Sequence, residues 1–166
     1  MRKAGLFGSL LVLALLVPRP LAAHCEIPCG IYDDQARAQR IAEHIMTIEK
    51  SMRQIAELRA AGEKNYNQLV RWIVNKEDHA TKLQHIVTQY FMTQRLKPAD
   101  PADEAAHGKY MAQLEVLHGM LVAAMRAKQT TDLAHVARLR ELLERFRTLY
   151  FGEKAEAGAH AHGHSH

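Results

Sequence analysis

The sequence lacks the features of several large protein classes. Its only two cysteines, Cys25 and Cys29, lie four positions apart, so the Cys-x-x-Cys spacing of redox and haem-attachment motifs is missing. No stretch alternates between apolar and polar residues as an amphipathic strand does. The longest apolar run, residues 6–17, is interrupted and too short to span a membrane. Because no basic stripe is interleaved with aromatic residues, the sequence gives no argument for nucleic-acid binding.

The first 23 residues have the pattern of a secretory leader. Arg2 and Lys3 precede the apolar run, and Ala22 and Ala23 supply small residues at a cleavage point. We predict cleavage before His24 and export to the periplasm or the extracellular space. Because the leader carries three basic residues, its removal lowers the net charge from +4 to +1 and leaves 143 residues, a suitable length for one domain.

Four amphipathic stretches follow and predict an all-α protein. They cover about residues 34–59, 64–96, 102–128 and 130–150, and apolar residues recur in each at intervals of three or four. Asp33 or Asp34 is the predicted N-cap of the first helix, and Thr130 or Thr131 that of the fourth. Gly62 is expected to end the first helix.

Short connections favour antiparallel neighbours, so the expected architecture of residues 33–151 is an up-down-up-down four-helix bundle. The apolar positions of the four helices define its expected core: Ile41, Ile45, Ile48, Met52, Ile55, Leu58, Leu69, Trp72, Ile73, Leu83, Ile86, Val87, Tyr90, Phe91, Tyr110, Leu114, Leu117, Leu121, Met125, Leu133, Val136, Leu139, Leu143, Phe146 and Tyr150.

Residues 24–32, His-Cys-Glu-Ile-Pro-Cys-Gly-Ile-Tyr, concentrate the chemistry of the chain, and we call them the hook. Cleavage before His24 frees an α-amine next to an imidazole, and Cys25 and Cys29 add two thiolates. The amine and the deprotonated backbone nitrogen of Cys25 complete a plane of two nitrogens and two sulfurs, with the imidazole in an axial position. Such a plane favours nickel(II) or copper(II), whereas the soft thiolates make copper(I) and zinc competitors.

Two features of the hook bear on its closure around one ion. Pro28 restricts the backbone just before Cys29, and Gly30 allows backbone conformations that other residues avoid. A Cys25–Cys29 disulfide is the alternative use of the two thiols, but a bridge over so short a loop is strained and stabilises little.

The hook resembles the mature N-terminus of nickel superoxide dismutases, His-Cys-x-x-Pro-Cys-Gly-x-Tyr. All six fixed positions are present here: His24, Cys25, Pro28, Cys29, Gly30 and Tyr32. The helical body of suitable length directly after the hook also resembles that family.

The resemblance implies an enzyme that converts superoxide to dioxygen and hydrogen peroxide at one nickel ion per subunit, cycling between +2 and +3. It implies that His24, Cys25 and Cys29 are the metal ligands and that Tyr32 is the catalytic residue at the open axial face. It also implies a homohexamer of four-helix subunits. One departure concerns the outer shell: ungapped matching puts Arg40 where the family has a Glu, and Glu43 and Arg71 are the candidate substitutes.

Other readings of the chain remain open. A secreted nickel- or copper-binding module without turnover, or a disulfide-stabilised structural helical protein, would also have a hook and a bundle. Residues 152–166 are a low-complexity tail, either solvated or left from purification, or a loose collector of nickel, copper or zinc. Its histidines are His160, His162, His164 and His166.

The internal histidines are scattered and are expected to be surface or core residues rather than ligands. His79 and Glu43 can support a site in the core, but no paired Glu-x-x-His motif of di-iron bundles is present.

Overall fold

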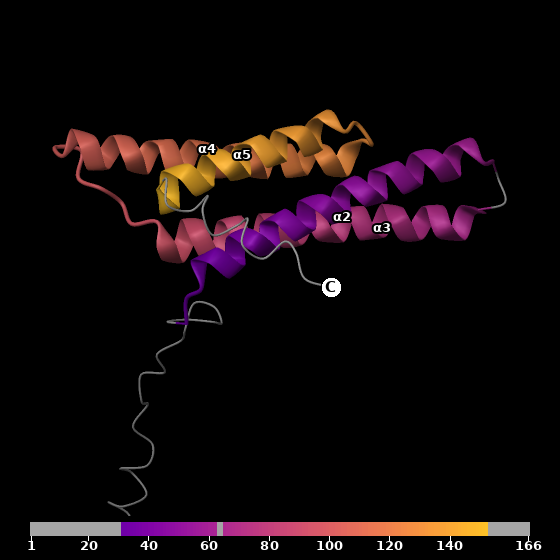
Figure 1. Ribbon diagram of the computed structural model, residues 1–166, viewed down its shortest axis with the longest axis horizontal. Helices are drawn as coiled ribbons and strands as arrows, with labels where there is room; N and C mark the ends of the chain where they lie inside the picture. The colour runs from indigo at the N-terminus through magenta and orange to yellow at the C-terminus, as the bar shows by residue number, and fades with distance from the viewer. Residues whose placement is uncertain (1–30, 63–64, 153–166) are drawn as a thin grey trace, which may run out of the picture. The chain divides into compact units, whose positions relative to one another are not determined.

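The computed structural model describes residues 31–62 and 65–152, and within these ranges the chain is helical and has no strand. Its elements are α2 (Asp34–Ala60), α3 (Tyr66–His85), the π-helix η2 (Ile86–Arg95) that continues α3, α4 (Glu104–Gln129) and α5 (Ala134–Phe151). Consecutive helical rods run in opposite directions (Figure 1). The predicted all-α fold is confirmed. The hook up to Gly30, the leader and the tail after Gly152 lie outside the described residues.

The four rods surround one core. α2 packs against α3 and α5, and α4 packs against α3 and α5, so each rod contacts two neighbours. The periodicity predicted most of the core, but not Val116 and Met120 of α4. The largest fully buried side chains come from every rod: Phe91, Phe146, Ile41, Ile45, Ile48, Met52, Leu83, Leu117, Met120, Leu139, Val87 and Val116.

The ends of α2 form as the sequence predicted. The Asp33 carboxylate accepts a hydrogen bond from the backbone N–H of Ala36 at 2.9 Å, so Asp33 is the N-cap. At the other end Gly62 has a φ of 83°, a left-handed conformation that glycine adopts without strain.

The predicted start of the fourth helix was wrong. α5 begins at Ala134, with Leu133 at the N-cap position and no capping side chain. Thr130 Oγ1 instead accepts from the N–H of Asp132 at 3.1 Å, and Asp132 Oδ1 accepts from the N–H of Ala134 at 2.9 Å. Each side chain thus bonds to the backbone two residues further on, a turn that competes with helical hydrogen bonding, so the helix begins only at Ala134.

The second predicted helix is not α-helical throughout. Residues 86–95 form a π-helix, and the N–H of Leu96 donates to the carbonyl of Phe91, five residues back, at 2.8 Å. The wider turn buries the adjacent side chains of Tyr90 and Phe91 together. Departures of this kind often occur near functional sites.

Five expected core residues are not part of the core. Ile73 and Met125 are exposed, and Leu58, Leu69 and Trp72 are half-buried outside the core cluster. In Figure 1 the end of α2 and the start of α3 extend past the α4–α5 turn. The first half of α3 therefore has fewer neighbours to cover it, which leaves Trp72 and Ile73 less buried than their periodicity indicated.

An exposed apolar row runs along this first half of α3, and we call it the α3 stripe. Its positions recur at helical spacing on one face. Its members are 39 to 60 % exposed: Tyr66, Val70, Ile73 and Val74.

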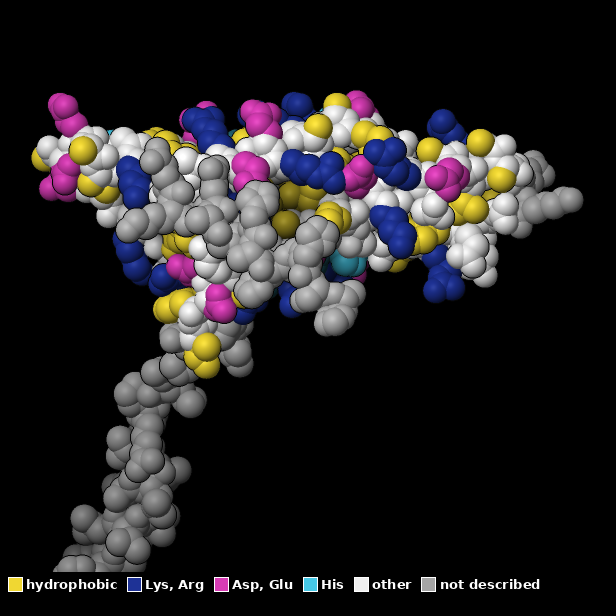
Figure 2. All heavy atoms as spheres, in the orientation of Figure 1, with side chains coloured by type: hydrophobic (Ala, Val, Ile, Leu, Met, Phe, Trp, Pro, Cys, Tyr) yellow, Lys and Arg dark blue, Asp and Glu magenta, His cyan; other side chains and the backbone are white. Residues whose placement is uncertain are grey.

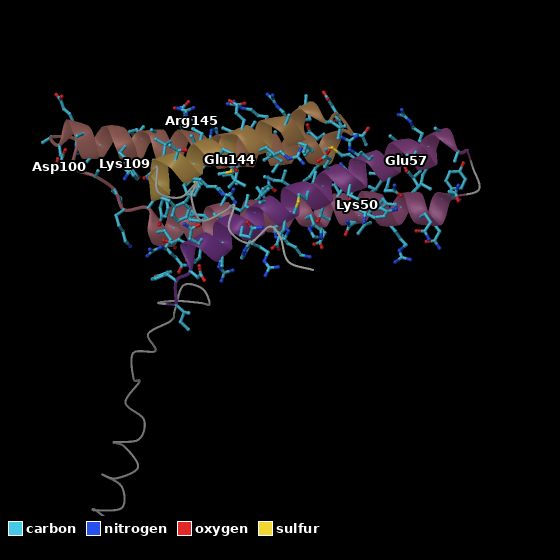
Figure 3. All side chains as sticks on the ribbon, viewed as in Figure 1. Lys50, Glu57, Asp100, Lys109, Glu144 and Arg145 are labelled. Carbon is cyan, nitrogen blue, oxygen red and sulfur yellow. The ribbon has the colours of Figure 1, made fainter. Side chains whose placement is uncertain are left out.

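The remaining surface is charged and mixed in sign. Figure 2 shows Lys and Arg side chains interspersed with Asp and Glu over the described part of the face in view. Figure 3 shows the side chains of Glu57 and Arg145 pointing away from the bundle. Among the described helices, none combines the length and the apolar character needed to cross a bilayer.

A buried lysine joins α3 to the end of α4. The Lys76 side chain is 4 % exposed, and its Nζ donates to the carbonyls of Ala127 at 2.7 Å, Lys128 and Thr130 at 3.3 Å. Glu77 lies 3.0 Å from the same ammonium. The charge therefore satisfies carbonyls that the last turn of α4 leaves without helical partners, at the negative end of the helix dipole.

Two histidines meet between α2 and α3. His44 Nδ1 and His79 Nδ1 are 3.0 Å apart, and the rings are nearly perpendicular. Burial, reinforced by the nearby charges of His79, Lys82 and Arg40, lowers the pKa of His44 to about 4, although Glu43 acts in the opposite direction. Burial and the charge of Lys82 also lower the pKa of His79, although the charge of Asp78 acts in the opposite direction. The pair is therefore neutral near pH 7, with one ring able to donate and the other to accept.

Replacing the buried lysine tests its role at the end of α4. We expect Lys76→Met to lower the free energy of unfolding by about 1–3 kcal/mol, because the α4 carbonyls lose a charged donor without gaining contact with water. Urea denaturation followed by circular dichroism measures this change. The matched control is Lys82→Met, since Lys82 forms an exposed pair with Asp78 and such pairs contribute only about 0.3–0.5 kcal/mol. Equal effects of the two substitutions would contradict this role.

The histidine pair predicts a loss of stability on mild acidification. Below pH 6.5 the unfolded chain binds a proton at His44, whereas the folded chain resists it until about pH 4. The free energy of unfolding should therefore fall by about 1–2 kcal/mol between pH 6.5 and 5. Three carboxylates with lowered pKa values also stabilise the folded chain: Asp34, Glu49 and Asp78. Their contribution to the free energy of unfolding is lost only below about pH 4.5, outside this window.

Urea titrations at several pH values check this window. His44→Leu should flatten the slope, and His118→Leu, at an exposed position, should keep it. An unchanged slope in His44→Leu would show that the pair does not carry the pH dependence.

Candidate metal centre

Of the predicted site residues, Tyr32 is among the described ones. His24, Cys25 and Cys29 lie outside the described residues, so their geometry stays a prediction. A boundary between two structural units falls directly after Tyr32, whose side chain is 42 % exposed. The donors supplied by the hook sequence, two thiolates, an imidazole and an amine, suit a thiophilic metal that accepts square-planar coordination.

The bundle begins with two aspartates that have different tasks. Asp33 caps α2, and Asp34 is the first residue of that helix. The Asp34 carboxylate points to side chains from distant parts of the chain. Arg95, the last residue of η2, donates from Nε to Oδ1 at 2.8 Å and from Nη2 to Oδ2 at 2.7 Å.

Two tyrosines complete this arrangement. Tyr90 of η2 donates its hydroxyl to Asp34 Oδ1 at 2.7 Å, and Tyr150 of α5 donates to Oδ2 at 2.9 Å. Each carboxylate oxygen thus accepts two hydrogen bonds, and the bidentate arginine is the strong form of such a pair. We call Asp34, Tyr90, Arg95 and Tyr150 the Asp34 cluster.

The titration behaviour of the cluster follows from these contacts. Burial alone would raise the pKa of Asp34, but hydrogen bonds from Arg95, Tyr90 and Tyr150 outweigh it and hold that pKa below its usual value. Burial and the hydrogen bond to Asp34 raise the pKa of Tyr90 to about 12, and the same causes raise the pKa of Tyr150. At neutral pH the carboxylate is therefore charged and both phenols keep their protons.

Aromatic packing supports the cluster from the core side. The rings of Phe146 and Tyr150 stack with centroids 5.1 Å apart, and Phe91 meets Phe146 edge to face at 4.8 Å. The guanidinium of Arg37 lies 5.0 Å from the centre of the Tyr90 ring, a cation–π distance. The two phenols are consequently fixed between an apolar core and a charged acceptor.

The described part of the bundle offers no second metal centre. It holds no group of three or more His, Cys, Asp or Glu side chains that could bind an ion. His79 meets His44 rather than Glu43, and Glu43 pairs with Arg40 at 3.1 Å. Arg71 is exposed on α3.

The Asp34 cluster was not predicted from the sequence. Its residues are separated by 56, 61 and 116 positions from Asp34, and Tyr90 and Tyr150 were expected to be ordinary core residues. The sequence did hold one indication of such a cluster: a buried tyrosine hydroxyl usually has a polar partner, so the two expected core tyrosines implied polar residues nearby. Nothing local identified Asp34 as that partner.

Comparison with known proteins identifies the family. The family described as nickel-containing superoxide dismutase matches residues 19–154, which include the whole hook and the bundle. Searches of curated proteins and of solved structures gave no match. Since the family match covers most of the sequence, the chain belongs to the nickel-containing superoxide dismutases, which are oxidoreductases.

Proposed function

We propose that the hook, once residues 1–23 are removed, holds one nickel ion per chain and converts two superoxide anions and two protons to dioxygen and hydrogen peroxide. The observation that carries this proposal is the donor set of the hook within a family match that includes it. Bound there, nickel supplies one-electron chemistry by cycling between +2 and +3.

The ligand residues have distinct tasks in this proposal. The free amine of His24 and the backbone nitrogen of Cys25 would hold the metal at the start of the chain. The thiolates of Cys25 and Cys29 would donate electron density, which favours a higher oxidation state of nickel. The imidazole of His24 would be a further nitrogen ligand.

Tyr32 is the proposed catalytic residue. It lies three residues after Cys29, and its side chain is partly accessible to solvent. In the proposal its phenol would limit the access of substrate to the nickel and would hold a hydrogen-bonded path for the protons that peroxide formation consumes. The substrate is a small anion, so local positive potential would favour its capture.

Maturation by export would couple removal of the leader to metal binding. Before cleavage the nitrogen of His24 is an amide, which is a much poorer donor than an amine. The precursor is therefore expected to stay inactive until the leader is removed in the periplasm or outside the cell.

Assembly into a homohexamer is the last part of the proposal. The α3 stripe supports it, because four neighbouring apolar residues on one helix face form a patch that a second subunit can cover. Subunit interfaces commonly have such an apolar centre.

Serine substitutions test the proposed ligands. We expect processed Cys25→Ser and Cys29→Ser each to lose hook-bound nickel and essentially all dismutase activity, because a serine hydroxyl is a poor donor to nickel. Tyr32→Phe should retain about one nickel per chain and lose activity. Elemental analysis and superoxide decay measure both quantities, and helical circular dichroism should not change.

A tail variant keeps this experiment unambiguous. Replacing His160, His162, His164 and His166 with alanine removes the other candidate collector of nickel, so any remaining metal belongs to the hook. Nickel without turnover would instead favour the metal-binding module. An oxidised Cys25–Cys29 pair without metal would favour the structural protein.

A charge in the α3 stripe tests the assembly. Val70→Glu should shift sedimentation from an oligomer toward the monomer, because a carboxylate cannot be buried at an apolar interface without a partner. Met111→Glu is the control, since Met111 is a comparably exposed apolar residue on α4. A wild-type chain that sediments as a monomer would contradict the proposed hexamer.

A further inference from the structure

The Asp34 cluster occupies the place where the metal-binding segment joins the bundle. Asp34 follows Tyr32 by two residues and Cys29 by five. Because consecutive Cα atoms are about 3.8 Å apart, the Cα of Tyr32 stays within about 7.6 Å of that of Asp34 whatever the backbone conformation. A fixed Asp34 therefore restricts where Tyr32 can be.

The cluster fixes Asp34 from two directions. Arg95 and Tyr90 approach from η2, and Tyr150 approaches from α5, so the first turn of α2 is bound to both neighbouring rods. The side chains of Asp34 and Arg95 are only 17 % and 29 % exposed, so water screens their attraction less than in a surface pair. Such a joint is stiffer than a helix end secured by its cap alone.

We propose that Asp34 is a positioning residue for the hook: the cluster holds the start of α2 so that Tyr32 and the nickel ligands leave the bundle from one fixed point. The assignment rests on the proposed function. A fixed exit reduces the conformations that the hook loses when it closes on the metal, and so slows metal release.

Two variants loosen the joint in different ways. Asp34→Asn keeps the shape of the side chain but removes the charge that Arg95 and the phenols recognise. The double variant Tyr90→Phe with Tyr150→Phe keeps the aromatic core and removes the two hydroxyls. The control is Lys76→Met, which is expected to destabilise the bundle at the end of α4. This position lies near the start of α5, whereas Tyr150 of the cluster lies near the end of α5.

The first measurement needs no metal. Backbone ¹⁵N order parameters of Tyr32 and Asp33 in the processed, metal-free protein should fall in both cluster variants and should match the wild type in Lys76→Met. Unchanged order in the cluster variants would overturn the assignment.

The second measurement uses nickel itself. Transfer of nickel from the loaded protein to excess chelator should be about tenfold faster in Asp34→Asn than in the wild type, the lower end of the range for outer-shell substitutions. Lys76→Met should release nickel at the wild-type rate. Equal release from Asp34→Asn and the wild type, or equally fast release from Asp34→Asn and Lys76→Met, would overturn the assignment. If the wild type takes up no nickel in the hook, the proposed function fails instead, and the order parameters alone decide whether the joint positions Tyr32.

Discussion

The Asp34 carboxylate accepts hydrogen bonds from Arg95, Tyr90 and Tyr150, and through them the beginning of α2 is bound to η2 and to the end of α5. In sequence, Asp34 comes two residues after the hook, which carries the proposed metal ligands. Three donors from two elements restrict the carboxylate more than any single pair would. The π-helix matters here, because its wider turn buries Tyr90 and Phe91 side by side while Arg95 still reaches the same acceptor.

The described residues of the bundle outside the Asp34 cluster form further polar contacts between helices, and none of these is a candidate metal site. Lys76 secures the end of α4, and the neutral His44–His79 pair lies between α2 and α3. Neither arrangement brings together three potential metal ligands. A helical bundle by itself implies no activity. In the proposed function the activity depends on the hook, and the bundle would hold the hook and form the contacts between subunits.

Much of the fold and the family were predictable because the signals are local. The intervals of Ile41, Ile45 and Ile48 predict a helix without knowledge of its partners, and the six fixed residues of the hook lie within nine positions. The α5 start, the π-helix and the Asp34 cluster were not predictable in this way. Thr130 and Asp132 form turns whose geometry competes with a cap, and Tyr150 meets Asp34 across 116 positions. Contacts over that distance depend on how the helices pack, which periodicity does not encode.

The central claim is that a newly freed amine at His24 completes a nickel centre with two thiolates. The most direct measurement compares nickel binding by two otherwise identical chains, one beginning at His24 and one retaining Ala23. The account predicts about one tightly bound nickel per chain for the first and greatly weakened binding for the second, because one added residue converts the amine to an amide. Equal nickel affinity and equal dismutase activity in the two chains would contradict it.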